Sequence, residues 1–248
     1  MKICLNICYQ GSDFHGWQTQ PTVVTVQETL EQTLFKLFKK RISVYGCGRT
    51  DAGVHAKEMF AHFDFESIED TSDLAHRLNN YLPADIAVKA ILKVKPESHA
   101  RFDALERTYE YWLVQQKNPC DLDTGHYVNR LMDIQKMNEA AKVIMEHTDF
   151  ECFSKSQTDV KTYLCDIKKA KWKEMDDRLV FTISADRFLR NMVRAIVGTL
   201  LEVGLGKWTV DDVKTILESN DRSKAGTSVP AKGLYLVNIK YPQKIINP

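Results

Sequence analysis

The chain has 248 residues, of which 44% are hydrophobic and 27% are charged, as is usual for a globular protein of one large or two small domains. Its formal net charge is +1, so bulk charge does not indicate a nucleic-acid binder, and any basic surface must come from local clustering. No apolar run approaches the ~20 residues that a membrane helix needs. The composition therefore argues against a membrane protein.

The cysteines are scattered along the chain and contain no Cys-x-x-Cys pair or neighbouring histidine cluster. This pattern predicts that the protein has no zinc site or other metal centre. The first nine residues are too short and too interrupted for a signal peptide, and together with scattered thiols they predict a reducing, cytoplasmic location. The cysteines are Cys4, Cys8, Cys47, Cys120, Cys152 and Cys165.

Alternating and helical patterns of apolar residues divide the first part of the chain, residues 1–105, into strands and helices. Thr25 with Glu28 three residues later has capping-box spacing. The predicted elements are a strand over 3–9, a helix that Thr25 opens and that ends in the basic residues Lys36, Lys39, Lys40 and Arg41, strands over 42–45 and 59–65, a helix that starts near Thr71 or Ser72 and is ended by 79–83, and a strand over 85–91.

The second part, residues 106–248, repeats this plan loosely, although no residue-level repeat is visible. Its predicted elements are a strand over 107–114, a helix capped by Asp133 and running to Met145, strands over 165–172 and 179–184, a helix from Phe188 to Val203, a helix capped by Thr209, a polar loop over 219–232 and a strand over 233–239. These patterns predict an α+β fold. We expect two similar sandwich-like halves with mainly antiparallel sheets, packed side by side, with the active-site cleft between them.

The segment Gly48–Ala56, which reads GRTDAGVHA, lies between two predicted strands. A carboxylate on such a turn projects from a rigid scaffold, where catalytic groups tend to lie. The same letters also suit an ordinary hairpin turn, with Asp51 bonding its own backbone. Spacing alone leaves the two interpretations about even.

Three arginines accompany the predicted helix that begins at Phe188. Arg187, Arg190 and Arg194 have i, i+3 and i+7 spacing and would share one side of the helix. Solvent exposure is the simplest interpretation for Arg187 and Arg190. Arg194 lies deep in an apolar stretch, so its guanidinium is expected to need a carboxylate partner, and Asp51 is one candidate. Gly198, one turn further on, leaves room for a close approach.

Two other short motifs point to different functions. Asp123-Thr124-Gly125 is the triplet of aspartic proteases, but that chemistry needs two carboxylates, and only a symmetric dimer could supply the second copy. The run 204–207 reads GLGK, yet it follows a helix and lacks the spacing and hydroxyl residue of a phosphate loop. His15 and His62 are interpreted as ordinary packing or surface residues. Hydrolase and metal chemistry therefore have little support.

Taken together, the motifs of the chain resemble the tRNA pseudouridine synthase A family. The resemblance covers nearly the whole chain and depends on the order and spacing of its blocks. The family commonly has an Asp at the position of Gln10 and a Ser at that of Asp103, and neither departure touches the expected chemistry. The blocks are YQGS at 9–12, FHGWQTQ at 14–20, TVQ at 25–27, GRTDAGVHA at 48–56, LNNYLP at 78–83, HARF at 99–102, YEY at 109–111, FLRNMVRAIVG at 188–198 and PAKGLYL at 230–236.

The resemblance implies isomerisation of uridine to pseudouridine at positions 38, 39 and 40 of the anticodon stem-loop of tRNA. It assigns Asp51 as the catalytic aspartate and Arg194 as the arginine that pairs with it. Tyr109 would stack on the target base, and Arg49 would help to hold the flipped nucleotide out of the helix. The family works as a homodimer and uses no cofactor, so we expect neither a cofactor nor a metal.

RNA phosphates require basic surface, which the net charge of +1 does not itself supply. The basic residues that could line a cleft are Arg101, Arg107, Lys168, Lys169 and Lys171. Two alternatives stay open: a non-catalytic RNA-binding module in which Asp51 is only a turn residue, and a dimeric protease that uses Asp123.

Overall fold

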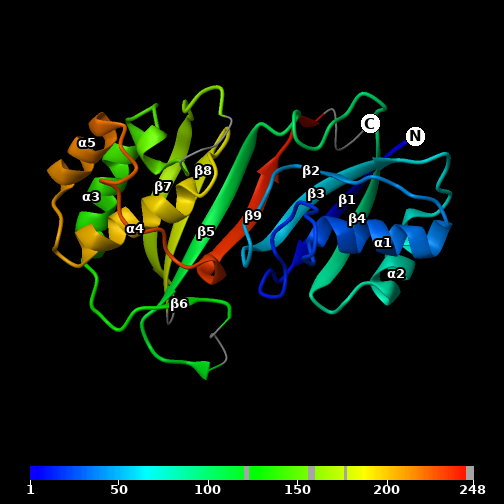
Figure 1. Ribbon diagram of the computed structural model, residues 1–248, viewed down its shortest axis with the longest axis horizontal. Helices are drawn as coiled ribbons and strands as arrows, with labels where there is room; N and C mark the ends of the chain where they lie inside the picture. Colours follow the sequence, from blue (N-terminus) through cyan, green and yellow to red (C-terminus); the bar gives the residue numbers. More distant parts are fainter. Residues whose placement is uncertain (120–122, 156–159, 176–177, 244–248) are drawn as a thin grey trace. The chain divides into compact units, whose positions relative to one another are not determined.

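A computed structural model describes residues 1–119, 123–155, 160–175 and 178–243, and it confirms the α+β class (Figure 1). Contacts within the chain group it into two compact units. Unit 1 comprises residues 1–106 together with the segment from residue 235 onward, and unit 2 comprises residues 107–234. The division into halves at residue 105 stays a prediction.

Unit 1 contains a mixed sheet with the strand order β4-β1-β3-β9. Strand β1 pairs antiparallel with both β3 and β4, whereas β3 and β9 run parallel, with His55 opposite Tyr235. The short β2 pairs with β3. The strands are β1 (Lys2–Tyr9), β2 (Tyr45–Gly46), β3 (His55–Asp64), β4 (Ile86–Val94) and β9 (Leu234–Lys240).

Two helices accompany this sheet, α1 (Val26–Phe38) and α2 (Thr71–Tyr81) (Figure 1). The Thr25 hydroxyl accepts a hydrogen bond from the Glu28 N–H, as the capping signature predicts. Leu30 and Leu34 of α1 are fully buried, because their four-residue spacing places both on one face.

Unit 2 contains the antiparallel strand order β5-β8-β7, with β6 parallel to β5. Figure 1 shows the helices of this unit gathered beside its sheet, and α3 packs against β7, α4 and α5. The strands are β5 (Glu106–Val114), β6 (His126–Tyr127), β7 (Ile167–Met175) and β8 (Arg178–Ala185), and the helices are α3 (Ile134–Met145), α4 (Met192–Gly204) and α5 (Val210–Ser219).

An asparagine side chain protects one edge strand in each unit. The Asn79 amide of α2 donates to the Val88 carbonyl and accepts from the Val88 N–H, at 2.9 and 2.7 Å. Asn138 of α3 makes the same pair of bonds with Trp172, at 3.2 and 2.8 Å. Unpaired strand edges are templates for aggregation. These bonds occupy edge groups and fix each helix to its strand.

The predicted strand over 42–45 is wrong, because only Tyr45 and Gly46 pair as a strand. The alternation does describe burial, since Ile42 and Val44 are buried. However, side chains of α1 form the hydrogen bonds of the Val44 backbone. The Val44 N–H donates to Glu31 Oε1 at 2.9 Å, and the Val44 carbonyl accepts from Gln27 Nε2 at 3.1 Å. Period-two burial therefore occurs here without a strand ladder.

The predicted start of the arginine helix at Phe188 is also wrong, because α4 begins at Met192. Asn191 has a φ of 65°, in the left-handed region, so it interrupts the backbone before the helix begins. Arg187 and Arg190 therefore lie outside the helix, and the shared side predicted for them with Arg194 does not form. Among the helices in the described ranges, none is long and apolar enough to cross a membrane.

Candidate active site

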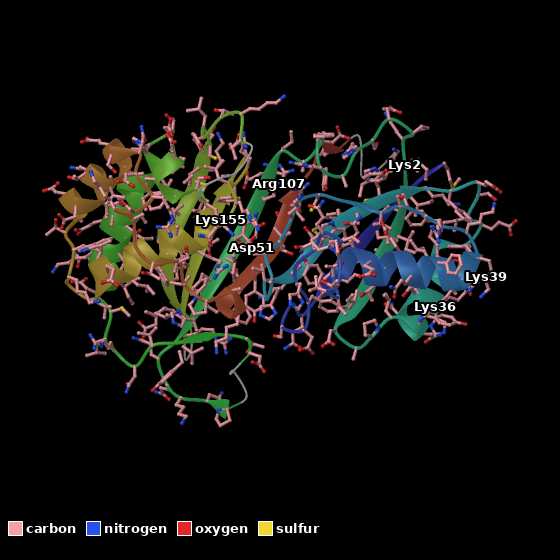
Figure 2. All side chains as sticks on the ribbon, viewed as in Figure 1. Lys2, Lys36, Lys39, Asp51, Arg107 and Lys155 are labelled. Atoms are coloured by element: carbon pink, nitrogen blue, oxygen red, sulfur yellow. The ribbon has the colours of Figure 1, made fainter. Side chains whose placement is uncertain are left out.

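Asp51 lies in the loop that leads from β2 into β3, and Figure 2 labels it there. Strand β2 pairs with the second half of β3, with Gly46 opposite Ala61, so this connection is not a tight hairpin turn. The Asp51 carbonyl accepts from the Val54 N–H at 3.2 Å, and Gly53 has a φ of 77°. Asp51 is half-buried, whereas Arg49 is exposed.

The segment 11–17 fixes the backbone on both sides of Asp51. The Trp17 N–H donates to the Thr50 carbonyl at 3.1 Å, and the Gly53 N–H donates to the Phe14 carbonyl at 3.2 Å. Gly16 has a φ of 86°, and a Cβ there would lie 2.5 Å from the Thr50 carbonyl oxygen. Glycine is therefore needed where this segment meets the loop.

Side chains of the adjoining strands hold the same loop. The Tyr9 and Thr50 hydroxyls are 2.8 Å apart and form a buried hydrogen bond. His55 is 2% exposed, its Nδ1 accepts from the Gly11 N–H at 3.0 Å, and its ring stacks on Tyr235 with centroids 4.6 Å apart. A ring nitrogen that accepts carries no proton, so His55 is the tautomer protonated at Nε2.

The patterns in the sequence assign no role to these supporting residues. Their signal was present in the blocks 9–12 and 14–20, which contain the glycines and aromatic residues that now contact the Asp51 loop. Asp51 thus lies in a loop whose backbone is held by a second segment of the chain, residues 11–17. Such a support suits a side chain that must keep one orientation.

Tyr109 and Arg194 both lie in unit 2. Tyr109 is a half-buried residue of β5, opposite Ile183 of β8. The Phe188 ring meets the Tyr109 ring edge-on, with centroids 5.2 Å apart and an interplanar angle of 88°. This contact packs the tyrosine ring against a second aromatic ring in the edge-to-face geometry that aromatic pairs prefer.

Arg194 lies in the first turn of α4 and binds Val229. Its Nε donates to the Val229 carbonyl at 2.7 Å, and the Val229 N–H donates to the Arg194 carbonyl at 3.2 Å. The Tyr111 hydroxyl donates to the next carbonyl, that of Pro230, at 2.9 Å. Burial raises the pKa of Tyr111 above its usual range, and the positive charge of Arg194 opposes this rise.

The predicted close approach at Gly198 is confirmed, and the approaching group is backbone. A Cβ on Gly198 would lie 1.9 Å from the Thr227 carbonyl oxygen. The Gly226 N–H also donates to Thr199 Oγ1 at 3.0 Å. Arg222 also binds this loop, with Nη2 donating to Ser228 Oγ at 2.8 Å. The Arg194 side chain therefore rests on a loop that is pressed against its own helix.

The predicted RNA-binding residues occupy several different positions. Arg101 is exposed in the loop before β5, and Arg107 Nη1 donates to the Asp186 carbonyl at 2.8 Å. Lys168 forms an ion pair with Asp166. Lys169 and Lys171 alternate along β7 as exposed residues, so they share one face of that strand.

The predicted site residues are divided between the two units. Arg49, Asp51 and Arg101 belong to unit 1. Tyr109, Arg107, Arg194 and the three lysines belong to unit 2. Within the described ranges, no three His, Cys, Asp or Glu side chains group as a metal site would require. Asp123 lies in a turn, and Cys120 lies outside the described residues.

Comparison with known proteins identifies the family to which this chain belongs. A family model described as tRNA pseudouridine synthase matches residues 7–103 and 140–242. The tRNA pseudouridine synthase A of Bacteroides thetaiotaomicron is 50% identical over 244 residues, which cover 97% of this chain and 91% of the relative. That of Bacillus subtilis is 40% identical over 246 residues, which cover 97% and 99%. The chain belongs to the tRNA pseudouridine synthase A family, a family of isomerases.

Proposed function

We propose that this protein isomerises uridine to pseudouridine in tRNA, at positions 38, 39 and 40 of the anticodon stem-loop. The observation that carries the proposal is the match to tRNA pseudouridine synthases along nearly the whole chain. The supported loop of Asp51 agrees with it, because main-chain hydrogen bonds hold the backbone on both sides of this residue.

The reaction needs no oxidant and no activated donor. The bond between ribose C1′ and uracil N1 breaks, the base turns, and C1′ bonds to C5. The C5 hydrogen leaves as a proton, and N1 gains a proton, so the atoms balance. Asp51 serves as the nucleophile or base, and its carboxylate is the form that can do either. No cofactor is proposed.

Base flipping brings the target to this carboxylate. A nucleotide within a stem-loop must be extruded, which costs a few kcal/mol. We propose that stacking on Tyr109 returns about 1–3 kcal/mol, and that Arg49 helps to hold the extruded nucleotide. The edge-on Phe188 ring supports this role, because it packs against the tyrosine ring that would meet the base.

Arg194 is proposed to pair with the Asp51 carboxylate, to keep it ionised and to orient it. The pair would lie in a cleft between two similar α+β halves, residues 1–105 and 106–248. Arg107, Arg101, Lys168, Lys169 and Lys171 are proposed to contact tRNA phosphates. We further propose that the enzyme is a cytoplasmic homodimer.

Mapping of modified positions tests the proposed substrate. An unmodified tRNA transcript with uridines at positions 38, 39 and 40 is incubated with the protein, and carbodiimide-dependent stops of reverse transcriptase are recorded. New stops should mark those positions and leave the other uridines unchanged. A second transcript with cytidines at the three positions is the control. Stops confined to another loop would contradict the assignment of the anticodon stem-loop.

A further inference from the structure

A cluster of exposed rings stands on unit 1 and plays no part in holding the Asp51 loop. Phe102 is 75% exposed and Tyr45 is 53% exposed. The Phe102 ring lies against the His99 ring with centroids 4.3 Å apart, and the Tyr45 and His99 centroids are 6.4 Å apart. We call Tyr45, His99, Arg101 and Phe102 the aromatic patch.

The loop that carries His99, Arg101 and Phe102 is held by hydrogen bonds. His99 Nδ1 accepts from the Arg101 N–H at 3.1 Å, and the His99 N–H donates to Asp103 Oδ2 at 2.6 Å. The Ala100 N–H donates to Nδ1 of the buried His62 at 3.2 Å. An exposed phenyl ring is therefore presented from a fixed backbone, which lowers the entropic cost of binding a partner.

Cationic groups adjoin the rings. The Arg101 guanidinium carbon lies 5.8 Å from the centroid of the Phe102 ring. Burial lowers the pKa of His99, the charges of Lys2 and Arg101 lower it further, and Asp103 raises it. The Arg101 guanidinium therefore places a positive charge beside the exposed Phe102 ring.

Exposed rings beside an arginine are how proteins hold unstacked nucleotides, with the ring facing the base and the cation near the phosphate. We propose that the aromatic patch binds an unpaired nucleotide of the substrate tRNA, distinct from the uridine that reacts. The base would stack on Phe102, and Arg101 would contact the adjoining phosphate. This inference rests on the proposed function and adds a second stacking contact to it.

The test measures binding of an unmodified tRNA transcript to Phe102→Ala by fluorescence anisotropy. The Kd should rise about tenfold, the lower part of the range for loss of one base–aromatic stack. The Kd of Phe102→Leu should rise by the same factor, because leucine keeps the apolar bulk but has no π face. Phe102→Trp should bind the transcript with the Kd of the native chain. Phe35→Ala is the matched control, since Phe35 is 47% exposed on α1 and lies outside the patch.

Sedimentation of each variant separates this partner from a second copy of the chain. If Phe102→Ala changes the oligomeric state, the patch is a contact between copies and the proposal is overturned. An unchanged Kd for Phe102→Ala would overturn the proposal as well. So would an equal loss of affinity in Phe102→Trp and Phe102→Ala. Absence of pseudouridine formation by the native chain would instead contradict the proposed function, and the anisotropy measurement does not depend on it.

Discussion

At the scale of single residues, the side chains around Asp51 have a structural role that is distinct from the chemical role proposed for Asp51. Thr50, Tyr9 and His55 hold the backbone, and His55 does so only as a neutral ring. His62 belongs to the same sheet and also accepts a backbone N–H. Burial is the main reason that the pKa of His62 is lowered to about 4, and the positive charges of His99 and Lys2 add to the effect.

His62 should therefore make stability depend on pH. An unfolded histidine has a pKa of about 6.5, so its contribution is complete above that pH and is lost as pH falls toward about 4. The difference in free energy of unfolding between the native chain and His62→Gln should shrink by about 1.4 kcal/mol per pH unit within this window. Urea unfolding at several pH values measures it, with the exposed His15→Gln as control. A constant difference from pH 7 to pH 4.5 would contradict the assignment.

At the scale of elements, α4 and the loop over 225–230 form one support for Arg194. Patterns in the sequence located the apolar face of this helix and the close approach at Gly198. They could not locate the helix start, because Asn191 adopts a left-handed conformation that apolar periodicity does not report. They also missed Val229, whose carbonyl binds the Arg194 side chain, since a backbone acceptor leaves no mark on residue type.

Gly198→Ala should disturb this support. Its Cβ would overlap the Thr227 carbonyl oxygen, so the loop must move, at a cost of about 1–3 kcal/mol in the free energy of unfolding. The segment that binds Arg194 would move with it, so activity should fall as well. Gly48→Ala is the control for stability, because a Cβ there meets nothing within 4 Å. Denaturant unfolding checks the prediction, and equal stability of the two variants would refute it.

At the scale of the whole molecule, the sequence predicts the fold class and the family, whereas the contacts around Asp51 are visible only in the structure. The α+β class followed from alternating and helical patterns, and the family followed from the order of motif blocks. The segment 42–45 shows the limit of such patterns, because α1 side chains replaced the expected strand ladder. How the segment 11–17 supports Asp51 needed coordinates, since those contacts join residues about 35 positions apart through main-chain atoms.

We propose that Asp51 carries out the isomerisation of uridine in tRNA. Tritium release from a transcript labelled at uracil C5 tests this role of Asp51, because formation of the C5 glycosidic bond must expel that hydrogen. The native chain and the control Asp85→Asn should release tritium, and Asp51→Asn should bind the transcript but release none. Release by Asp51→Asn at the native rate would contradict the role of this carboxylate, and no release by the native chain would contradict the reaction itself.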